Sequence, residues 1–146
     1  MVTRSGAAAY QKTGQQSGVL DADPHRLIQL LYQGALDNLA KARGFMERKD
    51  FEAKGQVINK AIEIIGSLQG VLDHEQGGEI AANLDRLYTY MLERIFEASR
   101  SNQVEIVDEV TAILREIKSG WDEIREQYVT TSMTDVPDSA SSAVDG

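Results

Sequence analysis

The sequence contains no cysteine, and proline occurs only twice in 146 residues. The absence of cysteine excludes disulfide bridges and thiolate chemistry, and it fits a reducing cytoplasm. Pro24 and Pro137 bracket about 110 residues in which no proline interrupts a helix. No stretch reaches the roughly 18 apolar residues of a membrane-spanning helix, and the N-terminus lacks the apolar run of a secretory signal. The sequence therefore predicts a cytoplasmic protein without direct membrane insertion.

Positive charge is also scarce, because 15 basic residues stand against 23 acidic ones and the formal net charge is −8. Binding to nucleic acid requires lysine and arginine to neutralise phosphates, so we expect no nucleic-acid partner. The apolar fraction of 42% and the chain length suit a single globular domain with one core.

Apolar residues in the middle of the chain recur at spacings of three and four, which predicts helices. Asp23 is suited to cap a first helix, with Pro24 at the first helical position, where its missing N–H costs nothing. That helix should end around residues 48–49, and Asp50 is the next candidate cap. The second helix should stop at residues 73–78, where a pair of glycines indicates a loop.

The third helix should carry apolar residues from Ile80 to Ala98 and end near residues 99–102. The fourth has the most regular apolar seam, formed by Val107, Val110, Leu114, Ile117, Trp121, Ile124 and Tyr128. We predict an all-α, antiparallel up-down four-helix bundle over residues 23–128. Residues 1–22 form a flexible N-terminal segment that can include a short helix, and residues 129–146 a disordered tail.

The second helix carries more apolar surface than one packing stripe needs. Val57, Ile64 and Val71, spaced by seven, line one border of its wide apolar arc. Leu92 and Phe96 lie beside the core stripe of the third helix in the same way. Wide arcs can serve two neighbours in a bundle, or they can leave a groove for a partner helix. The pattern alone fits both interpretations.

Neither histidine belongs to a recognisable site. A di-iron bundle needs Glu-x-x-His, but Ala22 precedes His25 by three residues and Val71 precedes His74 by three. We interpret His25 as a surface or capping residue, and Trp121 as part of the core. Acidic residues 73, 75 and 79 form a solvated turn with favourable charge at the start of the third helix. No residues converge on catalysis, and we expect no enzyme activity, no metal and no cofactor.

Three stretches of the sequence resemble the flagellar secretion chaperone family FliS. They are ADPHRLIQLLYQGALDNLAKA (residues 22–42), KGQVINKAIEIIGSLQGVLD (54–73) and GGEIAANLDRLYTYMLERI (77–95). Tyr10 followed by Gln11, ahead of the bundle, also fits the family. The chain has Gln33 where the family pattern commonly has an acidic residue, so no role for a charge is carried over there.

The resemblance implies a chaperone that binds the C-terminal segment of flagellin in the cytoplasm and prevents premature polymerisation. The loaded chaperone is then recognised by the flagellar type III export gate through its membrane protein FlhA. The segment around Tyr10 in such proteins can pack over the apolar surface and is implicated in partner binding. The candidate partner-binding residues are therefore Tyr10, Leu20, Val57, Ile64, Val71, Leu92 and Phe96.

Two alternatives stay open at this point. One is a structural bundle that uses its spare apolar surface to form a homodimer. The other is a regulatory adaptor in flagellar assembly that binds a factor other than flagellin.

Overall fold

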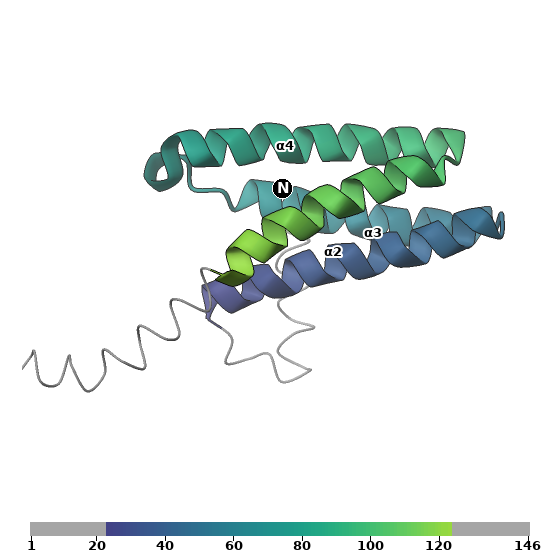
Figure 1. The fold of residues 1–146 in the computed structure, drawn as a ribbon, viewed down its shortest axis with the longest axis horizontal. Coiled ribbons are helices and arrows are strands. Elements are labelled where there is room, and N and C mark those ends of the chain that lie inside the picture. The colour runs from purple at the N-terminus through teal and green to yellow at the C-terminus, as the bar shows by residue number, and fades with distance from the viewer. Residues whose placement is uncertain (1–22, 124–146) are drawn as a thin grey trace, which may run out of the picture.

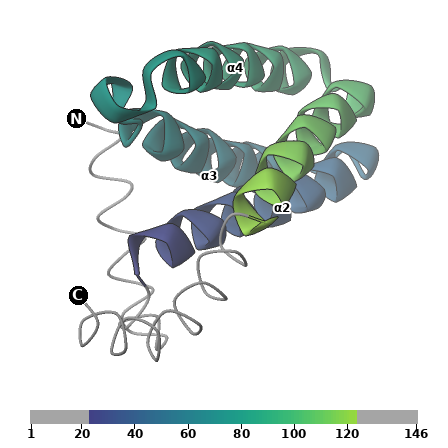
Figure 2. The ribbon, with the colours of Figure 1, turned by 60° about the vertical axis from the view of Figure 1, so that its left-hand side comes forward.

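The computed structural model describes residues 23–123, and this part of the chain forms four helices and no strand (Figure 1). Helix α2 spans Pro24–Glu47, α3 spans Phe51–Gly70 and α4 spans His74–Ser101, and a further helix runs through residues 104–123. Consecutive helices run in opposite directions, which confirms the antiparallel four-helix bundle (Figures 1 and 2). Tyr10, Leu20 and the expected tail at 129–146 lie outside the described residues.

The helix starts follow from side chains that bind the free backbone N–H groups of a first turn. Asp23 accepts a hydrogen bond from the backbone N–H of Arg26 at 2.8 Å, and Pro24 opens the helix as expected. Asp50 accepts from Ala53 N–H at 3.3 Å. Such a cap contributes about 1 kcal/mol to helix stability. Both caps predicted from the sequence are confirmed.

The expected loop at residues 73–78 is wrong in its extent. Asp73 accepts hydrogen bonds from two backbone N–H groups, at 3.1 and 3.0 Å, and α4 therefore begins directly after it. The glycine pair lies within the first turns of α4, where Gly78 interrupts the helix with φ 51° and ψ −123°. Glycine tolerates this backbone conformation because it has no Cβ. Ile80, expected in the core, follows this break and is 72% exposed.

The core runs along the centre of the bundle and includes fully buried side chains of all four helices, among them Leu39, Ile65, Met91 and Leu114. Each such side chain stabilises the fold by about 1.5–3 kcal/mol relative to full exposure. Two buried tyrosines, Tyr32 of α2 and Tyr88 of α4, share a hydrogen bond between their hydroxyls at 2.5 Å. Burial raises the pKa of both hydroxyls, so both remain protonated at neutral pH.

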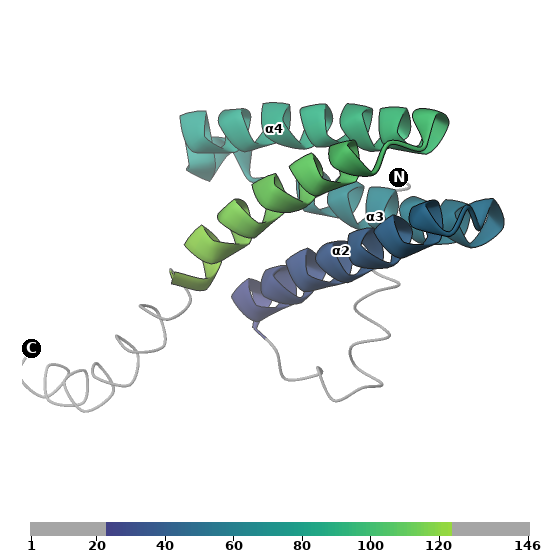
Figure 3. The ribbon, with the colours of Figure 1, turned by 45° about the vertical axis from the view of Figure 1, so that its right-hand side comes forward.

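The 104–123 helix crosses the bundle obliquely, starting near the end of α4 and ending beside the start of α2 (Figure 3). Its seam is buried at Val107, Val110 and Leu114 and only partly buried at Ile117 and Trp121. The indole of Trp121 stacks on His25, with ring centroids 4.3 Å apart, and its N–H donates to the His25 carbonyl at 2.9 Å. His25 is therefore a packing partner of Trp121 rather than a surface or capping residue.

Candidate functional site

Gln69 marks the side of α3 that faces α4. Its amide donates to Asp85 Oδ1 and to Thr89 Oγ1, both at 2.8 Å. At about 100° per residue, Val57 and Ile64 lie roughly 120–140° around α3 from Gln69. These two candidate residues therefore lie on a side of α3 that does not face α4.

The candidates on that side of α3 differ strongly in exposure. Ile64 is 6% exposed and belongs to the buried core, while Val57 is partly buried and packs against it. Val71 follows the end of α3 and is 51% exposed. Of this row, Val71 alone presents most of a large apolar side chain to solvent.

The candidates on α4 lie on its α3-facing side. Leu92 and Phe96 follow Thr89 by three and seven residues, which places them on the same side of the helix as the Gln69 contact. Leu92 is partly buried, and Phe96 is 60% exposed. The structure therefore does not bring the predicted site residues together. The candidates of α4 lie between α3 and α4, and Val57 and Ile64 lie on another side of α3.

Two further apolar residues of α3, Phe51 and Ile62, complete the surface between α3 and α4. Ile62 precedes Gln69 by two turns, and Phe51 precedes it by five, so both lie on the side of α3 that faces α4. Phe51 is 55% exposed because it opens the helix at the end of the bundle, and its position directly after a capping residue could have indicated this. We name this surface the α3–α4 strip; it consists of Phe51, Ile62, Leu92 and Phe96.

The strip has room beside it. Among residues 23–123, nothing beyond the helix's own nearby backbone would lie within 4 Å of a Cβ atom built on Gly55, so the described part of the chain leaves this position of α3 uncovered. Helix α3 also packs less extensively along α4 than along α2. Large apolar side chains with open space beside them are typical of surfaces that receive a partner.

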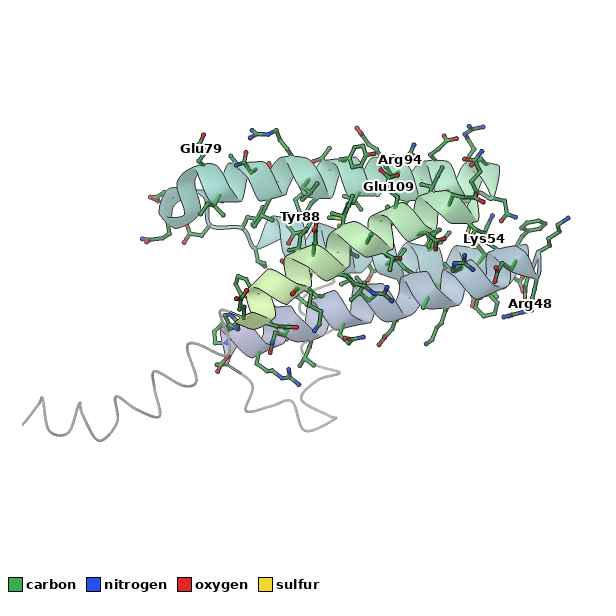
Figure 4. All side chains as sticks on the ribbon, in the orientation of Figure 1. Arg48, Lys54, Glu79, Tyr88, Arg94 and Glu109 are labelled. Carbon is green, nitrogen blue, oxygen red and sulfur yellow. The ribbon has the colours of Figure 1, made fainter. Side chains whose placement is uncertain are left out.

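A buried lysine closes the strip at one end. Lys54 is 7% exposed, and its ammonium donates to the carbonyl of Ser99 at 3.0 Å and to Asn102 Oδ1 at 3.4 Å. The ammonium also lies 4.9 Å from the ring centroid of Phe51. Asn102, which ends α4 in the left-handed conformation, donates to the carbonyl of Met46 at 3.3 Å. This junction connects α2, α3 and α4 and places the Lys54 ammonium at the face of the Phe51 ring. Figure 4 shows Lys54 at this end of the bundle.

The opposite side of α4 is polar where it meets the 104–123 helix. Glu109 accepts hydrogen bonds from the Tyr90 hydroxyl and, at 2.9 Å, from the Arg94 guanidinium. The hydrogen bond from Tyr90, followed by that from Arg94, lowers the pKa of Glu109, which therefore stays charged at neutral pH. Figure 4 shows Arg94 and Glu109 between the two helices, away from Lys54.

A hollow of about 410 Å³ lies between α2 and the 104–123 helix. Its lining is mostly polar: Gln33, Leu36, Asp37, Ala40, Arg115, Lys118, Ser119 and Asp122. Within residues 23–123, no three histidine, aspartate or glutamate side chains are grouped closely enough to hold a metal ion. No helix in this same range combines the length and apolar character needed to cross a membrane.

Fold and surface together define a small helical bundle that leaves an apolar strip open between two of its helices. The family model of the flagellar protein FliS matches residues 6–128. The flagellar secretion chaperone FliSB of Pseudomonas aeruginosa is 57% identical over 115 residues, which cover 79% of this chain and 91% of that protein. The flagellar secretion chaperone FliS of Salmonella typhimurium is 43% identical over 125 residues, covering 85% and 93%. The chain belongs to the FliS family.

Proposed function

We propose that this protein is a cytoplasmic export chaperone that binds the C-terminal segment of flagellin. It prevents premature polymerisation of the subunit and delivers it to the flagellar type III export apparatus, where FlhA recognises the loaded complex. The relatives named as flagellar secretion chaperones support an export role. The observation that carries helix binding is the α3–α4 strip, with two phenylalanines more than half exposed beside an intact core.

The strip suits an amphipathic helix. Its apolar residues lie on two neighbouring antiparallel helices, so a third helix can place its apolar face between them as a bundle neighbour does. Burying Phe51 and Phe96 would each add about 1.5–3 kcal/mol of favourable transfer free energy. A flagellin segment that is disordered alone and folds on binding loses part of this gain to ordering.

The proposed binding residues now divide into two groups. Phe96 and Leu92 belong to the α3–α4 strip, together with Phe51 and Ile62. Val71 and Val57 lie on another side of α3 and form a second proposed contact. Tyr10 and Leu20 stay proposals outside the described residues, and a homodimer in the absence of flagellin is a further proposal for the same apolar surface.

Binding of a fluorescent flagellin C-terminal peptide, followed by anisotropy, tests the strip. Phe96→Asp should weaken binding at least tenfold, since a charge would be buried in the interface. Ile80→Asp is the matched control, because Ile80 is 72% exposed and lies roughly 160° around α4 from Phe96. Equal affinity of the Phe96→Asp and Ile80→Asp variants would remove the strip from the proposal. Val71→Asp tests the second contact in the same assay.

A regulatory adaptor for another flagellar factor is the alternative function. It predicts that the peptide does not bind, while the protein retains a different component of a flagellated cell extract. Circular dichroism of each variant shows that its fold is intact before binding is compared.

A further inference from the structure

The 104–123 helix is attached to the bundle differently along its two halves. In residues 104–114, four apolar side chains are buried against the other helices: Ile106, Val107, Val110 and Leu114. In residues 115–123 no residue is fully buried, and Ile117 and Trp121 are only partly covered. The first half is therefore anchored in the core, whereas the second half is not. We name residues 115–123 the latch.

A polar hollow separates much of the latch from α2. The hollow of about 410 Å³ is lined on the side of the 104–123 helix by residues of the latch alone: Arg115, Lys118, Ser119 and Asp122. Fewer atoms touch across a hollow than across a packed interface, so dispersion and apolar burial hold this part of the helix only weakly.

The far end of the latch is fastened to the start of α2 (Figure 3). The indole of Trp121 stacks on the His25 ring with centroids 4.3 Å apart, and its N–H donates to the His25 carbonyl at 2.9 Å. The same indole meets the Tyr32 ring edge to face, with centroids 6.5 Å apart. Next to it, the Gln29 amide of α2 donates to Asp122 Oδ1. The latch is thus held mainly at its end, by one ring stack and two hydrogen bonds.

Such an arrangement favours local opening. Segments with little buried apolar surface open at a lower free energy than the core that they adjoin. Because the latch is the end of its helix, it can leave α2 without disturbing the buried residues 104–114. Opening would expose the side of Tyr32 that Trp121 covers, in a residue that is now 2% exposed. It would also release His25, which lies two residues after Asp23, where residues 1–22 join the bundle.

We propose that residues 115–123 are a latch that opens and closes on the start of α2 while the rest of the bundle stays folded, with the stack of Trp121 on His25 holding the closed state. The latch is a conformational device of the bundle itself. It does not depend on which partner occupies the α3–α4 strip.

Hydrogen exchange of the full-length protein, followed residue by residue by NMR, measures this opening. Relative to their intrinsic rates, the amides of residues 118–121 should exchange at least about 100-fold faster than those of residues 107–114. Low concentrations of urea should accelerate exchange at 107–114 but hardly at 118–121, because opening the latch exposes little surface. Equal protection and equal urea dependence in the two halves would overturn the proposal.

The variant His25→Ala tests the stack, since it removes the ring but keeps the carbonyl that accepts from Trp121. It should raise the exchange rates of the latch about 2–10-fold, as expected for the loss of one aromatic pair. The emission of Trp121, the single tryptophan of the chain, should shift to longer wavelength. His74→Ala is the matched control, because this second histidine is exposed in the first turn of α4.

If the latch of His25→Ala exchanges as slowly as that of the parent, the stack does not hold the latch closed and the proposal fails. Circular dichroism shows that each variant retains its helices. Should His25→Ala not fold, Trp121→Phe keeps a ring in place but removes the N–H that donates to the His25 carbonyl. This variant should also exchange faster in the latch, and unchanged rates would contradict the proposal in the same way.

Discussion

Replacing Lys54 with methionine tests the junction that closes the α3–α4 strip. Methionine keeps the apolar stem of the side chain in place but removes the ammonium, which donates to Ser99 O and Asn102 Oδ1. Hydrogen bonds from a charged donor contribute about 1.5–3 kcal/mol, and the contact with Phe51 about 0.5–1 kcal/mol. Relief of the desolvation of the buried charge offsets part of this loss. We expect the free energy of unfolding to fall by about 1.5–3 kcal/mol, a decrease consistent with these terms.

Urea unfolding followed by circular dichroism measures this change, and the same variant should unfold about 5–10 °C earlier on heating. Lys60→Met is the matched control, because Lys60 lies on the same helix with an exposed side chain. Its effect should stay within about 0.5 kcal/mol. If the Lys54→Met protein is as stable as the parent, the buried ammonium does not hold the three helices together, and the reasoning fails.

Three further outcomes are expected. Tyr88→Phe should lower the free energy of unfolding by about 1–3 kcal/mol, because the buried Tyr32 hydroxyl loses its partner. In a double-mutant cycle, removing both hydroxyls should lower it by less than either single change. Ile64→Asp should unfold the free protein in circular dichroism, since Ile64 is 6% exposed. The hydrogen bond from Arg43 lowers the pKa of Asp108, so this pair stabilises the fold above about pH 4. The difference in the free energy of unfolding between the parent and Asp108→Asn should vanish as the pH falls further.

Helix boundaries could be predicted because they depend on local chemistry. Asp23 and Asp50 cap their helices through backbone groups only three residues away. The same local logic explains the error at Gly78. A glycine pair indicates a break in the helix, but sequence alone did not show that Asp73 would start α4 before that break.

Exposure along the apolar arcs could not be predicted, since it depends on which helix covers which side. Ile64 and Phe51 both fit the apolar pattern of α3, yet one is buried and the other is 55% exposed. The difference follows from the side of α3 on which each residue lies and from the position of Phe51 at the end of the bundle. Likewise, Trp121 meets His25 only because the 104–123 helix crosses obliquely to the start of α2, a tertiary feature that periodicity does not contain.

The central claim is that this bundle binds the C-terminal segment of flagellin and folds it into a helix. Circular dichroism of the protein and the flagellin peptide, mixed at increasing ratios, measures this most directly. The claim predicts more helix in the mixture than in the sum of its components, with saturation at one peptide per protein. A spectrum equal to that sum at every ratio, at concentrations of about 50 μM where micromolar affinity would saturate, would contradict it.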